Sequence, residues 1–183
     1  LMAKKVMIVA GEVSGDQHAA RLVRDLRATR NDVEWFGIGG DALRRENVRT
    51  LVDARDMAVV GFFEVLARYP FFRRVFNQAV AWLDTEKPDA LLLVDYPGFN
   101  LRLAAKAHEK GIPVYYYVSP QVWAWHKSRI PKMAQILDLL MVIFPFEVDV
   151  FKGTGLKTVF VGHPLVESTK RTWAAPSPEL PWP

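Results

Sequence analysis

The sequence contains no cysteine. Disulfide bonds, thiolate catalysis and cysteine-ligated zinc sites are therefore excluded, and the composition fits a reducing cytoplasm. The four histidines show no H-x-x-x-H spacing, and no D-x-D sequence occurs. The first absence argues against a catalytic zinc site, and the second argues weakly against a metal-chelated sugar nucleotide. We predict neither a metal site nor a cofactor.

Long uninterrupted apolar runs are also missing. The most apolar stretch, residues 136–146, is interrupted by Asp138 and Pro145, and the apolar residues 6–10 are followed at once by Gly11. A membrane-spanning helix needs about 20 apolar residues, and a secretory signal needs a longer apolar core than residues 6–10 provide. We therefore expect a cytoplasmic protein that is either soluble or bound to a membrane surface.

Basic residues outnumber acidic ones, which gives a net charge of +4 and a pI near 9.4. This balance favours an anionic partner: a phosphate-bearing small molecule, an anionic lipid surface or a nucleic acid. The basic residues are spread along the chain, and no zinc finger or RNP motif occurs, so nucleic acid is not expected. A chain of 183 residues supports one domain of ordinary size.

Short apolar runs alternate with amphipathic stretches, a pattern typical of a parallel sheet with crossover helices. The predicted strands are residues 6–10, 34–38, 90–94, 113–118, 139–144 and 158–161. The predicted helices are residues 15–28 after an N-cap at Ser14, an amphipathic helix over residues 72–83, and residues 101–110 after an N-cap at Asn100. These elements predict an α/β fold with a Rossmann-like, doubly wound parallel sheet.

Ligands of such sheets bind beyond the carboxyl ends of the strands. This rule directs attention to four loops: Gly11–Asp16, Gly37–Asp41, Asp95–Asn100 and Ser119–Trp125. Residues 168–183 are rich in proline and show no periodicity, which indicates a linker or disordered tail.

The loop at Gly11–Asp16 reads Gly-Glu-Val-Ser-Gly-Asp and lies between the first strand and its helix. Its glycines would let a ligand approach the backbone, and a helix N-terminus favours anions. We therefore expect Ser14, Gly15 and Asp16 to contact substrate. The alternative is a capped helix start with turn glycines, because the loop is neither a dinucleotide-binding fingerprint nor a P-loop.

Asp95 directly follows the apolar strand of residues 90–94. A carboxylate at this position is partly desolvated, which raises its pKa toward the range of a general base. The alternative is a structural Asp that binds neighbouring loop amides. Further along the chain, Ser119, Trp123 and Trp125 follow another strand, and aromatic rings of this kind either line a sugar or acyl site or pack as a plug.

The segment of residues 57–74 is unusually aromatic and ends in arginines. It holds more large apolar groups than one amphipathic helix face can bury. We predict that a lipid-facing patch lies here, with rings meeting acyl chains or bilayer and arginines meeting anionic headgroups; its members are Phe62, Phe63, Arg68, Phe71, Arg73 and Arg74. The alternative is a core helix with its connecting loop.

Taken in order, these segments resemble the lipid-A-disaccharide synthase family. The shared motifs are the glycine loop, Ala58–Leu66, Val94–Asn100, Tyr117–Trp125, Phe144–Glu147 and Val161–Pro164. The resemblance implies the N-terminal, acceptor-binding domain of a GT-B glycosyltransferase over residues 1–167, with the UDP-sugar domain absent from this sequence. Asp95 matches the family's candidate base, and Asn100 belongs to the same motif.

In this family, 2,3-diacylglucosamine is transferred from its UDP derivative to 2,3-diacylglucosamine 1-phosphate, forming a β-1,6 linkage and releasing UDP. The resemblance thus implies a Gram-negative inner-membrane surface as the location and leaves a homodimer of the full-length enzyme open. Gly98 departs from the family pattern, because many relatives carry an acid there. Because the second domain is missing, we expect the chain alone to turn over little or no substrate.

Two other functions remain open at this stage. The chain could be half of another GT-B or nucleotide-sugar enzyme with a soluble acceptor, or a non-catalytic lipid-binding module. An exposed apolar surface near residues 62–72 would argue against a soluble acceptor, which gives no reason for such a surface. A transfer assay with a supplied second domain would distinguish the enzyme from a non-catalytic lipid-binding module.

Overall fold

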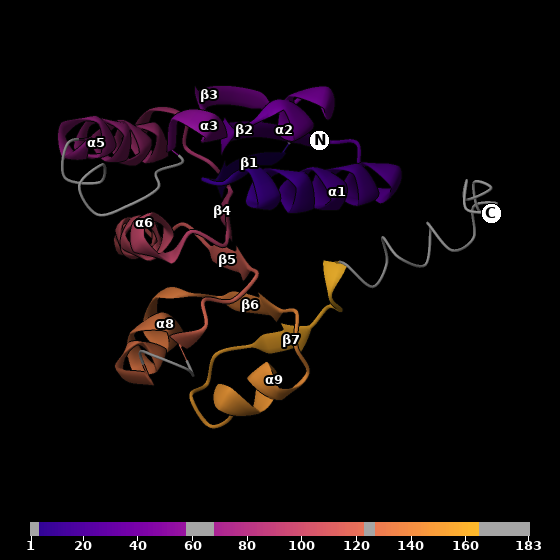
Figure 1. The fold of residues 1–183 in the computed structure, drawn as a ribbon, viewed down its shortest axis with the longest axis vertical. Helices are drawn as coiled ribbons and strands as arrows, with labels where there is room; N and C mark the ends of the chain where they lie inside the picture. The colour runs from indigo at the N-terminus through magenta and orange to yellow at the C-terminus, as the bar shows by residue number, and fades with distance from the viewer. Residues whose placement is uncertain (1–3, 58–67, 123–126, 165–183) are drawn as a thin grey trace, which may run out of the picture.

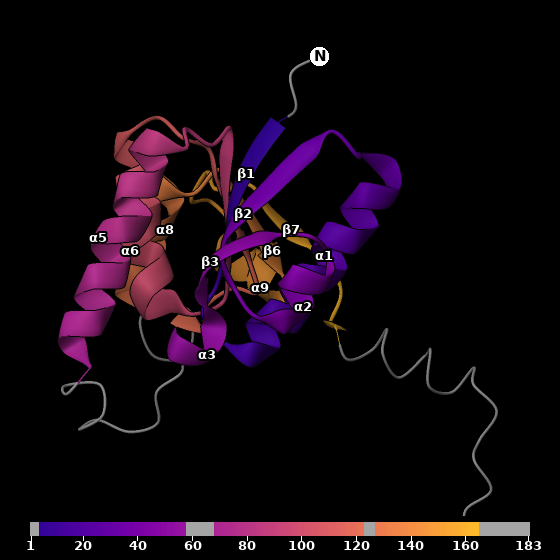
Figure 2. The same ribbon diagram turned by 90° about the horizontal axis from the view of Figure 1, so that it is seen from above.

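A computed structural model describes residues 4–57, 68–122 and 127–164 of the chain. These residues form a seven-stranded, wholly parallel sheet in the order β3-β2-β1-β4-β5-β6-β7, with helices on both faces (Figures 1 and 2). The predicted α/β, Rossmann-like fold is confirmed. The strands are β1 (Lys4–Ala10), β2 (Val33–Gly39), β3 (Arg49–Asp53), β4 (Ala90–Val94), β5 (Val114–Tyr117), β6 (Leu139–Val142) and β7 (Thr158–Phe160).

Helices connect the strands and cover the sheet. They are α1 (Val13–Thr29), α2 (Asp41–Arg45), α3 (Ala54–Met57), α5 (Tyr69–Thr85), α6 (Pro97–Glu109), α8 (Ile130–Ile136), α9 (Phe146–Val150) and the short 3-10 helix η1 (Lys127–Arg129). Figure 2 shows α1 and α2 on one side of the strands and α5, α6 and α8 on the other. Within the described residues, no helix has the length and apolar character that crossing a membrane requires.

The sheet separates two apolar cores, because successive side chains of a strand point to opposite faces. Met7 and Val9 of β1 belong to the core under α5, α6 and α8. Ile8 and Ala10 belong to the core under α1 and α2. All five residues of β4 are buried, as expected for a central strand with helices on both faces.

Each strand predicted from the apolar runs is present, but β3 was missed. It is an edge strand, bounded by Arg49 and Asp53, and its residues are partly or fully exposed. A strand that pairs on one side only needs little apolar surface, so its sequence lacks the run that marks the buried strands.

Two predicted helix starts are wrong. Helix α1 begins at Val13 with Glu12 at the N-cap, so Ser14 lies inside the first turn. Helix α6 begins at Pro97 with Tyr96 at the N-cap, so Asn100 is a buried helical residue and not a cap. Proline is favoured at the first helical position, and this signal should have placed the start of α6 correctly.

The strand order places the sheet's switch point between β1 and β4. From β1 the chain proceeds to β2 and β3 on one side, and β4 then starts the series β4 to β7 on the other. Loops that leave the carboxyl ends of β1 and β4 therefore diverge, and ligands of such sheets bind at this kind of point. The residues that follow these two strands are the first candidates for a functional site.

Candidate functional site

Asp95 lies at this switch point. It directly follows β4, whose last residue, Val94, pairs with Ala10 at the end of β1. Gly11 and Glu12 follow Ala10, so the two loops begin side by side. Asp95 is half-buried, so part of the residue is open to solvent.

The backbone around Asp95 is strained. Asp95 and Tyr96 both have a φ of 49°, and Val118, after the neighbouring strand β5, has a φ of 61°. Left-handed backbone is costly for residues other than glycine, and such residues cluster at functional sites. Of the five non-glycine residues with positive φ in the described chain, these three lie together at the carboxyl ends of β4 and β5.

Two buried side chains hold the strained turn. The amide nitrogen Nδ2 of Asn100 donates to the carbonyl oxygen of Asp95 at 2.8 Å and to that of Val94 at 3.3 Å. The hydroxyl of Tyr116 donates to the same Asp95 carbonyl, and both Asn100 and Tyr116 are fully buried. The predicted site residue Asn100 thus lies beneath Asp95 and positions its backbone.

The electrostatic surroundings of Asp95 suit a base. Burial raises the pKa of its carboxyl above the ordinary value, against the smaller opposing effects of a hydrogen bond from the Tyr96 N–H and the positive charge of His18. Loss of solvent and the nearby charge of Asp95 raise the pKa of Glu12 as well. Glu12 and His18 therefore belong to the same charged cluster, although the sequence analysis did not select either residue.

The glycine loop is shaped by packing. A Cβ atom on Gly11 would lie 2.5 Å from Cδ1 of Tyr96, so the ring of Tyr96 lies against a position that only glycine can fill. The hydroxyl of Tyr96 donates to the Met57 carbonyl at 3.0 Å. Gly15 is buried in α1 near Val94, and Ser14 is exposed in the first turn. Of the three predicted substrate contacts in this loop, Ser14 alone is exposed to solvent.

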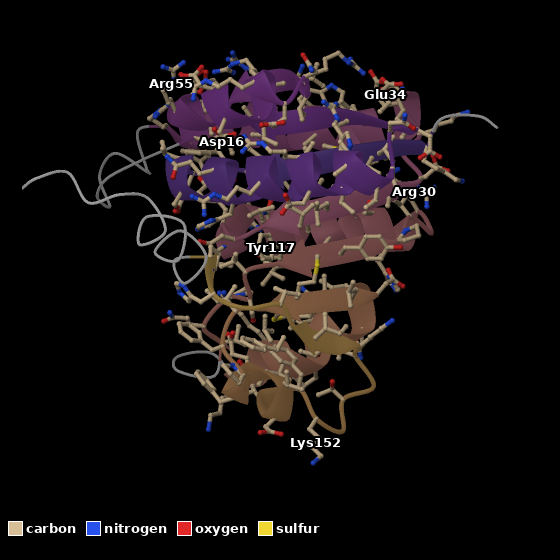
Figure 3. The ribbon with its side chains drawn as sticks, turned by 90° about the vertical axis from the view of Figure 1, so that its right-hand side faces the viewer. Asp16, Arg30, Glu34, Arg55, Tyr117 and Lys152 are labelled. Carbon is tan, nitrogen blue, oxygen red and sulfur yellow. The ribbon has the colours of Figure 1, made fainter. Side chains whose placement is uncertain are left out.

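Asp16 has a structural role. Its carboxylate is 4% exposed and accepts hydrogen bonds from the backbone N–H groups of Gly40, Ala42 and Leu43 at 2.7, 2.9 and 3.2 Å. These groups start α2, where N–H donors lack partners within the helix. Figure 3 shows Asp16 between α1 and α2. Because its oxygens face the protein, we do not include Asp16 in the proposed site.

The fourth predicted loop is only partly described. Ser119 follows the strained Val118 after β5, is buried, and donates through its hydroxyl to the Pro120 carbonyl at 3.1 Å. Trp123 and Trp125 lie outside the described residues, so their substrate contacts stay predictions.

A broad cavity of about 850 Å³ lies between α5 and α6, and its lining includes Tyr96, the residue after Asp95. We call it the aromatic groove, and its ring-bearing walls are Tyr69, Phe72, Phe76, Tyr96 and Phe99. Phe76 and Phe99 meet edge to face, with ring centroids 5.5 Å apart. The cations Arg73, Arg102, Lys106 and Lys132 and one carboxylate, Glu12, complete its lining together with smaller residues. This combination suits an apolar molecule with an anionic group.

Residues 6–176 match the lipid-A-disaccharide synthetase family. The chain belongs to this family. A lipid-A-disaccharide synthase of Trichlorobacter lovleyi is 46% identical over 164 residues, which are 90% of this chain and 43% of that protein. Lipid-A-disaccharide synthase 1 of Legionella pneumophila is 48% identical over 166 residues, with the same two shares. The chain therefore spans less than half the length of these relatives.

Solved structures support the fold. MurG from Acinetobacter baumannii superposes with a TM-score of 0.55 at 14% identity, over 98% of this chain and 48% of that one. A putative UDP-N-acetylglucosamine 2-epimerase from Listeria monocytogenes gives a TM-score of 0.67 at 13% identity, over 94% and 48%. The lipid-A-disaccharide synthetase family member described here thus has the architecture of one half of these larger proteins.

The predicted lipid-facing patch of this family member is described in part. Phe62 and Phe63 lie outside the described residues. Phe71 is half-buried against the core, and the guanidinium of Arg68 lies 4.9 Å from its ring centroid. Arg73 and Arg74 are exposed on α5. Arg73 and Arg74 thus have the exposure that the prediction requires, whereas Arg68 and Phe71 are partly covered by the protein.

No cluster of potential metal ligands occurs in residues 4–57, 68–122 and 127–164. The predicted residues Asp95, Asn100 and Ser119 lie near the carboxyl ends of β4 and β5, and their contacts with substrate stay predictions. Sequence reasoning missed Tyr96 and Tyr116, whose roles depend on contacts across the fold. Glu12 is a member of the family's glycine-loop motif, and that signal could have identified it.

Proposed function

We propose that this chain is the acceptor-binding half of a lipid-A-disaccharide synthase and that Asp95 is its general base. The proposed reaction transfers 2,3-diacylglucosamine from its UDP derivative to 2,3-diacylglucosamine 1-phosphate. The observation that carries the proposal is the position of Asp95, which is half-buried at the switch point and is followed by Tyr96, a residue that lines the aromatic groove. Family membership supports the choice of substrates.

The proposed chemistry follows from the acceptor's 6-hydroxyl, which is a poor nucleophile until it loses its proton. Asp95 accepts that proton while the oxygen attacks the anomeric carbon of the donor and the bond to UDP breaks. Inversion requires one in-line attack through an oxocarbenium-like transition state. A carboxyl with a raised pKa is a stronger base than ordinary Asp. A further domain of the whole protein would bind the UDP-sugar.

The aromatic groove favours a lipid acceptor over a soluble one. Each acyl methylene removed from water contributes about 0.8 kcal/mol, and half-buried rings of Phe72 and Phe76 offer the matching apolar surface. A soluble sugar would leave these rings in contact with water. A non-catalytic lipid-binding module would share the groove, so an assay of transfer separates it from the enzyme.

The direct test joins this chain to the C-terminal half of the Trichlorobacter lovleyi relative. We expect the chimera to form the β-1,6 disaccharide and release UDP, as measured with radiolabelled acceptor. The same chimera carrying Asp95→Asn is the matched control for background turnover. A chimera that is folded and binds UDP-sugar but transfers no more than this control would contradict the proposed function.

We further propose that the chain acts at the cytoplasmic surface of the inner membrane, with Arg73 and Arg74 near anionic headgroups. Basic residues near such a surface contribute about 1 kcal/mol each. The Arg73→Gln/Arg74→Gln variant should therefore bind anionic vesicles about 10- to 30-fold more weakly in a co-sedimentation assay at low salt.

The matched control for this experiment is Arg45→Gln/Lys152→Gln, which removes the same charge elsewhere. Arg45 and Lys152 are exposed and do not line the aromatic groove. Equal losses in the two variants would mean that total charge, and not this patch, determines binding. Phe62→Ser/Phe63→Ser tests the apolar part in the same assay. Formation of a homodimer by the full-length enzyme stays a prediction.

A further inference from the structure

A second cavity, of about 200 Å³, lies between α6 and α8. Its apolar walls come from Leu101, Met133 and Ile136, and its cations are Arg102, Arg129 and Lys132; we call it the cationic pocket. Pro97, Gly98, Arg102 and Lys132 line this pocket and the aromatic groove alike. The two cavities therefore adjoin across the first turns of α6.

The cations of this pocket lack counter-charges. Within the described part of the chain, none of the three makes an ion pair, and no carboxylate lines the pocket. Some arginines elsewhere have carboxylate partners, such as Arg24, Arg30, Arg44, Arg49 and Arg55. Others in the described residues, such as Arg45, Arg73 and Arg74, are exposed without an ion pair, so what is particular to this pocket is that three cations surround one cavity. Three like charges around one small cavity repel each other, and a bound anion removes that repulsion.

The start of α6 adds donors to the same place. The first backbone N–H groups of a helix have no partner within it, and the helix dipole makes this end positive. In α6, the first helical hydrogen bond runs from the N–H of Asn100 to the carbonyl oxygen of Tyr96 at 3.0 Å. Gly98 comes before Asn100 in the first turn of α6. A Cβ on Gly98 would meet no atom within 4 Å. The pocket is thus open above the backbone at this residue.

We propose that the cationic pocket binds the phosphate monoester of the acceptor while an acyl chain lies in the aromatic groove. Arg102, Arg129 and Lys132 then neutralise the phosphate, and Asp95 lies near the sugar that joins the two groups. This inference rests on the proposed function and names the part of the site that distinguishes acceptor from donor. A monophosphate is the group that the acceptor carries and a dephosphorylated sugar lacks.

The test measures binding of two soluble probes to the 183-residue chain by isothermal titration calorimetry. One probe is 2,3-diacylglucosamine 1-phosphate with six-carbon acyl chains, and the other is the same compound without phosphate. We expect the phosphorylated probe to bind at least about 10-fold more tightly at low salt. The variant Arg102→Ala/Lys132→Ala should reduce this ratio to near 1, and Arg45→Ala/Lys152→Ala should preserve it.

The outcomes separate this inference from the proposed function. Equal binding of both probes to the wild-type chain would overturn the phosphate site and leave the acceptor assignment standing. Binding of neither probe would overturn the acceptor assignment and the phosphate site with it. Inorganic phosphate serves as a competitor: if it abolishes the calorimetric binding of the phosphorylated probe at concentrations comparable to the probe's own, the pocket binds free phosphate and the lipid assignment fails.

Discussion

Replacing Asp95 with asparagine is expected to lower kcat about 10²- to 10⁴-fold in the full-length enzyme or in the chimera described above. This range is the usual contribution of a positioned general base. Asparagine has nearly the same shape and can still accept the hydrogen bond from the Tyr96 N–H, but it cannot take a proton. Acceptor binding should change little, so KM should stay near its wild-type value.

The pH profile provides a second measurement for Asp95. The base must be ionised to act, so kcat of the wild type should rise with pH through the raised pKa of Asp95 and then level off. The residual activity of Asp95→Asn should lack this rise. A variant with near-normal kcat, or with the wild-type pH profile, would exclude Asp95 as the base.

Stability gives the fold control for the same variant. Burial raises the pKa of Asp95 in the folded chain, so its ionised form is disfavoured there relative to the unfolded chain. The resulting cost is absent below the unfolded-state pKa and fully present above the folded-state pKa. Above the folded-state pKa, Asp95→Asn removes this cost, and we expect equal or greater thermal stability there. Loss of activity through unfolding would instead lower the melting temperature.

The buried strands could be predicted from the sequence because each is a short apolar run between polar turns. Residues 90–94 were predicted with the bounds that β4 has in the structure. The position of Asp95 followed from the same run, since ligands of a parallel sheet bind beyond its carboxyl end. The edge strand β3 could not be predicted in this way, because Arg49–Asp53 is partly exposed and has no such run.

The supporting contacts of the site could not be predicted, because they join distant parts of the chain. The sequence identifies Tyr116 only as a strand residue, yet its hydroxyl donates a hydrogen bond to the carbonyl oxygen of Asp95, 21 positions earlier in the chain. The sequence suggests that Asp16 is a loop carboxylate open to ligand. Its carboxylate instead accepts hydrogen bonds from N–H groups at the start of α2, 24 to 27 positions later in the chain. A local pattern identifies a polar residue near a strand end but does not reveal which way its side chain points.

The role of Gly37 likewise depends on a contact with a strand that is distant in the sequence. Gly37 was predicted to belong both to the strand of residues 34–38 and to the loop Gly37–Asp41, and it lies inside β2. Its φ is +145°, and a Cβ on it would lie 2.0 Å from the carbonyl oxygen of Ile8 in β1. The register of β2 with β3 shifts between Gly37 and Ile38. Gly37 is therefore required by close approach of two backbones at a strand irregularity.

Gly37→Ala is accordingly expected to destabilise the chain by more than about 4 kcal/mol, a large part of the 5–15 kcal/mol that stabilises a typical domain. The obstacle is backbone of a central strand, which cannot turn aside as a flexible side chain does, and the required φ adds strain of about 1–3 kcal/mol. Urea unfolding followed by circular dichroism measures the change.

Gly15→Ala is the matched control, because a Cβ there meets its nearest atom, the Val94 carbonyl oxygen, at an ordinary 3.7 Å. Alanine is favoured over glycine within a helix by roughly 1 kcal/mol, so this control should be as stable as the wild type or more so. Wild-type stability of Gly37→Ala would contradict the pairing of Ile8 with Gly37 and, with it, the arrangement of β1 and β2 at the switch point.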